Sequence, residues 1–188
     1  MQRRTFLAAA SMLTVAVPAL ADQAVTTPAP DPQNTINLDL TYGRVVIRLR
    51  PDLAPKMVER VKLLCHEHFY DGTPFHRVIE GFMAQGGDPT GTGEGGSKYP
   101  NVPAEFSDTA HFVRGTVGAA RTSDPNTANS QFFIMFAPNP SLDGQYTIFG
   151  QVISGMEYVD KIKRGEGESG MVTNPDKIVR MRLASDKS

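Results

Sequence analysis

The stretch from Phe75 to Asp88 constrains the fold of this chain more than any other segment. Two apolar runs flank Glu80-Gly81, a dipeptide typical of turns, and this arrangement predicts a β-hairpin. Arg77 and Gln85 are polar residues within these runs. A cation and a primary amide beside an apolar surface suit a substrate that is itself part amide and part apolar, and proline in a peptide is one such substrate. The alternative is an ordinary hairpin with a surface arginine and glutamine.

Short strands are expected along most of the remaining chain. Alternating or continuous apolar residues predict strands at residues 36–40, 45–49, 112–113, 117–120, 132–136, 147–152 and 177–183. Glycine and proline turns separate many of these segments. Such a succession of short strands favours a β-barrel or a β-sandwich, and the pattern alone does not choose between them.

Two helices are expected between the strands. Apolar residues at spacings of three and four predict a helix that begins near Pro55 and ends before Asp71, with Asp52 placed where a cap could form. A shorter amphipathic helix is expected after Gly155. The longer helix presents an apolar stripe, which we expect to cover one end of a barrel.

A second informative block, residues 118–134, has the sequence GAARTSDPNTANSQFFI. It is followed by Leu142-Asp143-Gly144 and by Thr147-Ile148-Phe149-Gly150. With residues 75–88, about forty residues earlier, it resembles the paired signature of the cyclophilins, which are peptidyl-prolyl cis-trans isomerases. The resemblance extends from Thr35 to the C-terminus. It implies a mainly β fold, a closed eight-stranded antiparallel barrel capped by two α-helices.

The resemblance also implies the residues of an active site. Arg77 matches the arginine that donates to the prolyl nitrogen during rotation, and Gln85 matches a neighbour that orients the guanidinium or binds a substrate carbonyl. A structural salt bridge is the alternative role for Arg77. The implied substrate-binding residues, some of them through backbone groups, are Phe82, Met83, Ala120, Arg121, Thr127, Gln131, Phe133, Leu142 and Tyr146. Rotation breaks no bond and transfers no proton, so we expect no cofactor and no metal, and His76 is expected to be a packing residue.

Three details within and after the second block refine this expectation. Phe132 and Phe133 must face opposite sides of a strand, and the residues alone leave open which one faces the pocket. The resemblance selects Phe133. Ser141 stands where many eukaryotic cyclophilins have a tryptophan that helps to bind cyclosporin, and Tyr146 stands where many have a histidine. We therefore expect weak or no cyclosporin binding and a resemblance to the bacterial branch of the family.

The first 34 residues are expected to lie outside the folded domain and to include an export signal. Arg3-Arg4, an uncharged apolar run and Pro18-Ala19-Leu20-Ala21 predict a signal peptide over residues 1–21, of the Sec or twin-arginine type. A retained anchor helix is the alternative. Residues 22–34 contain three prolines and are expected to form a flexible leader, followed by the catalytic domain at 35–188. These features predict a bacterial periplasmic or secreted protein with no membrane association after cleavage.

Charge excludes one class of partner. The formal net charge is −1, and cleavage after Ala21 would leave 17 basic against 20 acidic residues, with no basic run to follow a phosphate backbone. We therefore expect no nucleic acid partner. The expected function is isomerisation of X-Pro bonds in unfolded or folding proteins, by a monomer. The alternative is a non-catalytic module or holdase that binds proline-containing segments.

Three other signals carry less weight. Cys65 lies on the apolar side of the predicted helix, which favours a buried, inert thiol. Residues 91–96 satisfy the G-x-G-x-x-G spacing of dinucleotide sites, but no helix is expected to follow them. His66 and His68 are two residues apart on the predicted helix, so their side chains are expected to point in different directions and not to share a metal ion.

Overall fold

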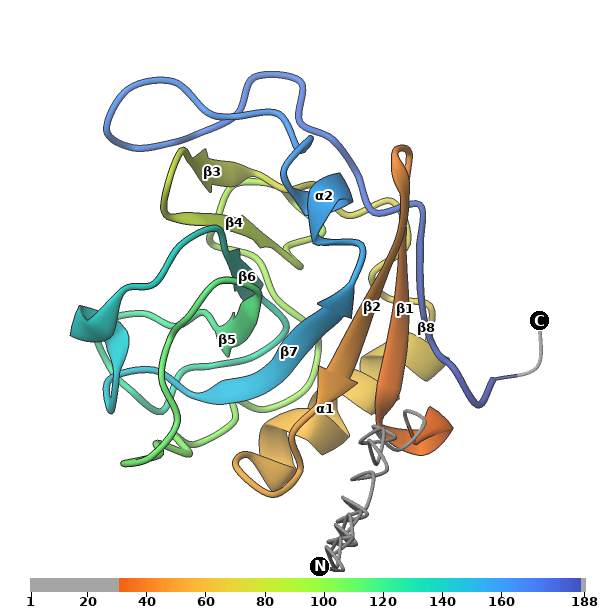
Figure 1. Cartoon of the computed structure of the whole chain (residues 1–188), viewed down its shortest axis with the longest axis vertical. Coiled ribbons are helices and arrows are strands. Elements are labelled where there is room, and N and C mark those ends of the chain that lie inside the picture. The colour runs from red at the N-terminus through yellow and green to blue at the C-terminus, as the bar shows by residue number, and fades with distance from the viewer. Residues whose placement is uncertain (1–30, 187–188) are drawn as a thin grey trace, which may run out of the picture.

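The computed structural model describes residues 31–186. Its strands are β1 (Thr35–Leu40), β2 (Gly43–Leu49), β3 (Arg77–Ile79), β4 (Met83–Gly86), β5 (Thr116–Ala119), β6 (Phe132–Met135), β7 (Ile148–Ser154) and β8 (Arg180–Leu183). The helices are α1 (Pro55–His66) and α2 (Met156–Val159), with 3-10 turns η1 (Pro32–Asn34) and η2 (Pro140–Leu142). The strands form one antiparallel, curled sheet in the order β3-β4-β6-β5-β7-β2-β1-β8 (Figure 1).

The sheet is a half-barrel, so the expectation of a closed barrel is wrong. No ladder joins the edge strands β3 and β8. The segments that precede them meet instead: Phe75 N–H donates to the Asp176 carbonyl, and Ile178 N–H donates to the Thr73 carbonyl, each over 2.9 Å. Between these two bonds lies an isolated bridge from Pro74 to Lys177. Proline has no N–H to donate, which limits further pairing at this seam.

The predicted strands correspond to β1, β2, β5, β6, β7 and β8, with ends shifted by up to three residues. The predicted strand at 112–113 is absent, because the chain bends there: Val113 N–H donates to the His111 carbonyl over 3.1 Å and to Thr116 Oγ1. Residues 1–21 and 22–30 lie outside the described part of the chain. Residues 31–34, at the end of the predicted leader, form η1, and the Asp31 carboxylate accepts from Gln33 N–H.

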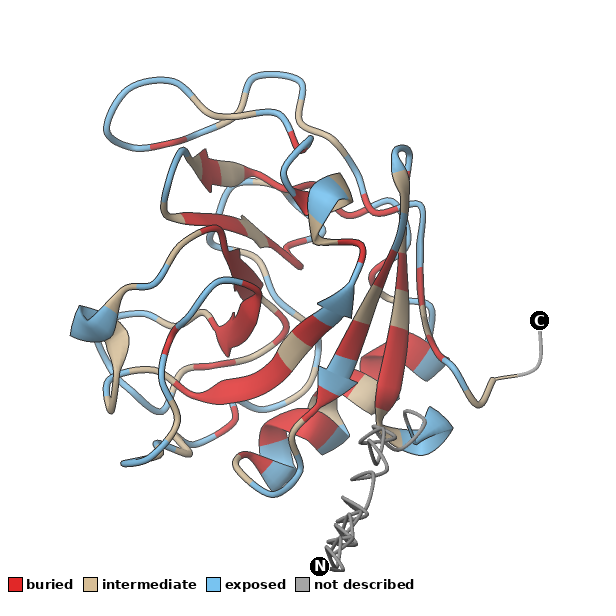
Figure 2. Cartoon of the chain, in the orientation of Figure 1, coloured by how far each residue is buried: buried red, intermediate tan, exposed pale blue. Residues whose placement is uncertain are grey.

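The core lies between the concave side of the sheet and α1, whose five buried residues are Met57, Val58, Val61, Leu64 and Cys65. Figure 2 shows the buried residues concentrated on the strands and on the sheet-facing side of α1. Within residues 31–186, no helix has the length and apolar content needed to cross a membrane.

The cap of α1 comes from a distant loop. The N-cap residue is Ala54, whose side chain makes no capping bond, so the expected cap by Asp52 is wrong. Two of the N–H groups that a helix leaves unpaired in its first turn, those of Lys56 and Met57, donate to the Glu105 carboxylate over 3.0 and 2.9 Å. Asp52 lies two residues before the N-cap and pairs with a neighbouring arginine instead.

Candidate active site

The β3–β4 hairpin positions the two predicted catalytic side chains. The turn residue Gly81 has φ of 70°, a conformation that glycine adopts without strain, and the strands pair so that Arg77 lies opposite Gln85. Arg77 Nη1 donates to Gln85 Oε1 over 3.3 Å. Cross-strand neighbours on one face of a sheet are expected to interact in this way. Arg77 makes no salt bridge with any residue between 31 and 186, so its alternative role as a structural ion pair gains no support.

A chain of side-chain amides continues from the arginine. Gln85 Nε2 donates to Gln131 Oε1 over 2.9 Å, and Gln131 Nε2 donates to the carbonyls of Gly93 and Gly95, each over 2.8 Å. The network therefore ties the centre of the site to the glycine-rich loop. Gln85 is held at both ends of its amide, which fixes the atom that faces Arg77.

The glycine-rich loop is organised by Asp88 rather than by a nucleotide-binding helix. The buried Asp88 carboxylate accepts from Thr90 N–H, from Thr90 Oγ1 and from the N–H groups of Gly93 and Gly95. Burial disfavours the charged form, but these hydrogen bonds outweigh it and lower the pKa of Asp88. No helix begins between this loop and β5, and Gly93, Gly95 and Gly96 line the hollow beside the pocket instead.

Arg77 and Gln85 open onto a pocket of about 200 Å³. Nine of the eleven predicted site residues line it together: Arg77, Phe82, Met83, Gln85, Ala120, Arg121, Phe133, Leu142 and Tyr146. They come from the β3–β4 hairpin, β6, η2 and the segments after β5 and η2. The other two, Thr127 and Gln131, line an adjoining hollow of about 510 Å³ that shares Gln85, Ala120 and Arg121 with the pocket. All eleven residues therefore line one or both of two adjoining hollows.

Adjacent phenylalanines of β6 serve different sides of the sheet. Phe132 is fully buried in the core, edge-to-face with Tyr70 at a centroid distance of 5.7 Å. Phe133 lines the pocket and lies edge-to-face with Tyr146 at 5.8 Å. Behind it, the ring of Phe112 stacks on Phe133 at 5.6 Å. Phe112 was not predicted as a site residue, because a residue that supports a pocket wall from behind has no distinctive local pattern.

The two residues after β5, Ala120 and Arg121, are those expected to offer backbone groups to the substrate, and the structure differs in part from that expectation. The Ala120 N–H donates to the Gln131 carbonyl over 3.0 Å, so this backbone donor is already occupied within the protein. The Arg121 side chain packs over the ring of Tyr146 and donates from Nη2 to the Gln145 carbonyl over 2.8 Å. Arg121 therefore contributes its side chain to the pocket wall.

His76, the residue just before β3, is buried, with 1% of its surface exposed, and it does not line the 200 Å³ pocket. Neither ring nitrogen has a hydrogen-bond partner within residues 31–186. Burial lowers the pKa of His76, which favours the neutral ring. The environment is that of a packing residue.

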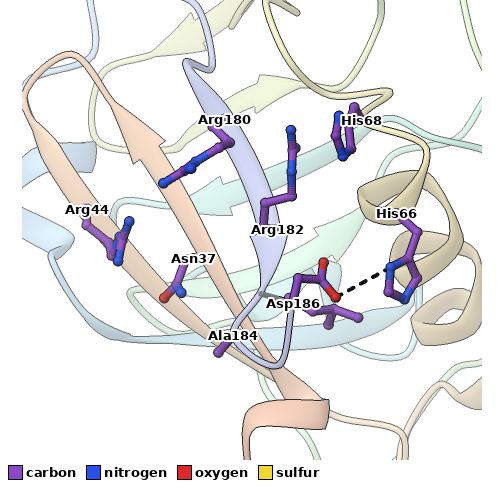
Figure 3. A pocket seen from close by; sticks show the side chains of 9 residues that line it. Asn37, Arg44, His66, His68, Arg180, Arg182, Ala184 and Asp186 are labelled. Carbon is purple, nitrogen blue, oxygen red and sulfur yellow. Dashed lines mark ion pairs between the residues drawn. The ribbon is translucent and has the colours of Figure 1, made fainter. Parts of the chain in front are cut away.

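A separate hollow of about 360 Å³ lies beside β8 and the end of α1 (Figure 3). His66 and His68 lie there with Arg44, Arg180 and Arg182. Each arginine is paired with a carboxylate, Arg44 and Arg180 with the shared Asp39 and Arg182 with Asp71, and His66 lies 3.4 Å from Asp186. The arginines of this hollow are therefore held in ion pairs with carboxylates of the same chain. Across the described residues, no three His, Cys, Asp or Glu side chains are grouped closely enough to hold a metal ion.

The comparisons with known proteins agree with this geometry. Residues 35–183 match the family model "Cyclophilin type peptidyl-prolyl cis-trans isomerase/CLD". A "probable peptidyl-prolyl cis-trans isomerase" of Brucella suis biovar 1 is 51% identical, with 97% of both chains aligned. A rat "peptidyl-prolyl cis-trans isomerase-like 3" is 42% identical over 69% of this chain and 82% of its own length.

Solved structures show the same fold. A Cryptosporidium parvum cyclophilin-type isomerase, crystallised in the presence of the dipeptide Ala-Pro, has a TM-score of 0.73 and 31% identity over 81% of this chain and 99% of its own. A Hirschia baltica cyclophilin has a TM-score of 0.73 and 27% identity over 84% of this chain and 76% of its own. The chain therefore belongs to the family of cyclophilin-type peptidyl-prolyl cis-trans isomerases.

Proposed function

We propose that this chain catalyses rotation about X-Pro peptide bonds and that Arg77 supplies the catalytic cation. The observation that carries the proposal is the guanidinium beside a pocket whose other walls include the rings of Phe82, Phe133 and Tyr146. A prolyl residue presents an apolar ring joined to an imide nitrogen. The apolar walls suit the ring, and the cation suits the nitrogen.

The mechanism depends on the half-turned state of the bond. Amide resonance makes the rotation slow, with a barrier of roughly 18–20 kcal/mol. As the bond turns, the prolyl nitrogen becomes pyramidal and gains a lone pair. A fixed donor aimed at that lone pair stabilises the half-turned state more than either planar state, and only this difference accelerates the reaction.

The hydrogen bonds of Arg77 suggest which donor acts. Nε donates to the Ser169 carbonyl over 3.0 Å and Nη1 donates to Gln85 over 3.3 Å. Among the residues that the structure describes, Nη2 has no partner. We assign Nη2 to the prolyl nitrogen, and Gln85 to the orientation of the guanidinium. An arginine suits this task because it stays charged and holds its donors in one plane.

The decisive experiment compares Arg77→Ala with the wild type on an X-Pro peptide in a protease-coupled assay. We expect kcat/KM to fall by roughly 100- to 1,000-fold, the usual effect of removing one donor that stabilises a transition state. The melting temperature should change little. Arg48→Ala, which removes an exposed arginine of β2, is the matched control and should keep full activity. Full activity of Arg77→Ala would remove the assigned role.

The same peptides separate an isomerase from a binding module or holdase. Rate enhancement and affinity are measured on one set of X-Pro peptides. An isomerisation rate that is raised by the wild type and not by Arg77→Ala would support the assignment as an isomerase. Tight binding without acceleration would favour the module, because a site that only binds a proline segment has no need of the cation.

The proposal includes export to a bacterial periplasm or exterior, where unfolded or folding proteins with X-Pro bonds would be the substrates. The support is the signal-like pattern of residues 1–21. Expression of the full chain in a bacterial host, followed by fractionation and mass determination, should find a monomer that begins at Asp22 outside the cytoplasm. A cytoplasmic product that retains residues 1–21 would argue against export. Weak cyclosporin binding and no nucleic acid binding remain expected.

A further inference from the structure

We infer that residues 165–172 form a strap that positions Arg77 from behind the site; the inference rests on the proposed function and adds a positioning element to it. The strap belongs to the long connection between α2 and β8. In Figure 1 this connection arches beside β3 at the end of the molecule that carries the β3–β4 hairpin. None of its residues lines the 200 Å³ pocket.

The strap is bound to the free edge of β3 and to the residue just before it by three backbone hydrogen bonds. Gly165 N–H donates to the Val78 carbonyl over 2.9 Å, and Val78 N–H donates to the Gly170 carbonyl over 2.7 Å. Val172 N–H donates to the His76 carbonyl over 2.9 Å. The strap therefore acts as a short added strand at the edge that the open half-barrel leaves without a partner strand.

The strap also closes on itself. Glu166 N–H donates to the Met171 carbonyl over 3.1 Å, and Glu166 and Met171 form an isolated bridge. Because both of its sides are attached to Val78, the tip between them has a fixed position above the hairpin. Ser169 lies in that tip, and its carbonyl accepts the hydrogen bond from Arg77 Nε.

This bond complements the one from Gln85. The guanidinium is planar, so holding Nε and Nη1 at two separate acceptors fixes both the position and the rotation of the plane. Nη2 is then held in one direction. A backbone carbonyl on a bonded strap is a rigid acceptor, and it gives the cation a fixed geometry before the substrate arrives.

Gly170 offers a way to displace the strap without touching Arg77, Ser169 or the pocket. Its φ is +69°, and an added Cβ would overlap Cγ1 of Ile79 and lie 3.2 Å from the Val78 carbonyl oxygen. Gly170→Ala should therefore move the tip away from β3. Gly72→Ala is the matched control: Gly72 has a φ of +76°, and an added Cβ would meet no atom within 4 Å.

The test is a double-mutant cycle on the full chain with the X-Pro peptide assay. Gly170→Ala should lower kcat by roughly 10- to 100-fold with KM changed less than about threefold, because misplacing a catalytic group by about 1 Å has effects of that order. Gly72→Ala should stay within about twofold of the wild type. In the Arg77→Ala background, Gly170→Ala should have less than about a twofold effect. An equal loss in both backgrounds would overturn the inference while the proposed function stands.

A second measurement does not depend on activity. The Arg77 Nε–H resonance is identified in ¹⁵N–¹H spectra as the arginine signal missing from Arg77→Ala. Its hydrogen should exchange with solvent at least tenfold more slowly than that of Arg48, and Gly170→Ala should abolish the difference. Equal exchange of the two side chains in the wild type would refute the strap even if the chain is an active isomerase. An inactive wild type with a protected Nε–H would instead contradict only the proposed function.

Discussion

The guanidinium of Arg121 lies over the ring of Tyr146, with its Cζ 4.2 Å from the ring centroid. Two further bonds, from Nη2 to the Gln145 carbonyl and from Nη1 to the Thr122 carbonyl, hold the side chain in this position. The ring of Tyr146 in turn lies edge-to-face with that of Phe133. One arginine therefore keeps the aromatic wall of the pocket in place from the solvent side.

Removing that contact should loosen the wall. We expect Arg121→Ala to raise KM for an X-Pro peptide about two- to fivefold, since an exposed cation–π contact contributes about 0.5–1 kcal/mol. The kcat should change less than KM, because Arg77 is untouched. Steady-state kinetics provide the measurement, and Arg48→Ala serves as the control for lost charge. A fall in kcat with constant KM would assign Arg121 a different role.

Replacing Phe82 should mainly lower activity, whereas replacing Phe132 should mainly lower stability. Phe82 is half-buried at the pocket, so Phe82→Ala should lower kcat/KM by at least tenfold with a small effect on unfolding. Phe132 is fully buried in the core, so Phe132→Ala should lower the free energy of unfolding by about 3–5 kcal/mol. Urea titration and the peptide assay measure the two effects. The prediction is wrong if both variants show the same profile.

The remote cap of α1 can be tested through Glu105. Glu105→Ala leaves the N–H groups of Lys56 and Met57 without their carboxylate and should lower the free energy of unfolding by about 0.5–2 kcal/mol. Glu59→Ala, on the exposed face of the same helix, should have an effect smaller than about 0.5 kcal/mol. Equal effects of the two variants would show that the loop carboxylate does not cap the helix.

Cys65 should be inert in the folded protein. Burial raises the pKa of Cys65 to about 12, from an ordinary value of 9.0. The thiolate is therefore scarce at pH 8, and alkylation by iodoacetamide should be at least 100-fold slower in buffer than in denaturant, as followed by mass spectrometry. The raised pKa also makes the free energy of unfolding depend on pH. Below pH 9 the thiol is neutral in the folded and the unfolded protein, and its contribution to stability is complete. As the pH rises toward 12 only the unfolded protein loses the proton, so this contribution is lost. Rapid labelling of the native protein would contradict this assignment.

Inhibition by cyclosporin should depend on the side chain at position 141. This exposed residue lies in η2 beside the pocket residue Leu142, and its hydroxyl donates to Asn139 over 2.7 Å. The family resemblance associates a tryptophan here with drug binding, so Ser141→Trp should strengthen inhibition by at least roughly tenfold. Burial of a large apolar side chain, worth about 1.5–3 kcal/mol, is sufficient for that gain. Strong inhibition of the wild type would show that Ser141 does not limit binding.

The sequence was informative where local patterns determine geometry. The turn at Glu80-Gly81 sets the hairpin register, and that register alone places Arg77 opposite Gln85. Strand alternation allowed only one of Phe132 and Phe133 to face the pocket, and the family resemblance selected Phe133. These expectations needed information from a few neighbouring residues.

The features that the sequence did not predict depend on residues that are far apart in the chain. Glu105 caps a helix that begins about fifty residues earlier, and no local pattern marks it as a cap. The acceptor for Arg77 Nε is a backbone carbonyl, a group that every residue has, so no residue type could reveal Ser169. The seam between β3 and β8 stays open around Pro74, and the periodicity of each strand says nothing about how the two edges of a curled sheet meet.

The pairing of β1 with β8 has a consequence for the order in which the protein assembles. The first and last strands of the domain are neighbours, so one side of β1 keeps unpaired backbone groups until the chain is complete through Leu183. Contacts between residues so distant in sequence form slowly, and exposed strand edges favour aggregation. The sheet therefore stays incomplete until Leu183 has been synthesised, and until then the unpaired side of β1 is open to contacts with other chains.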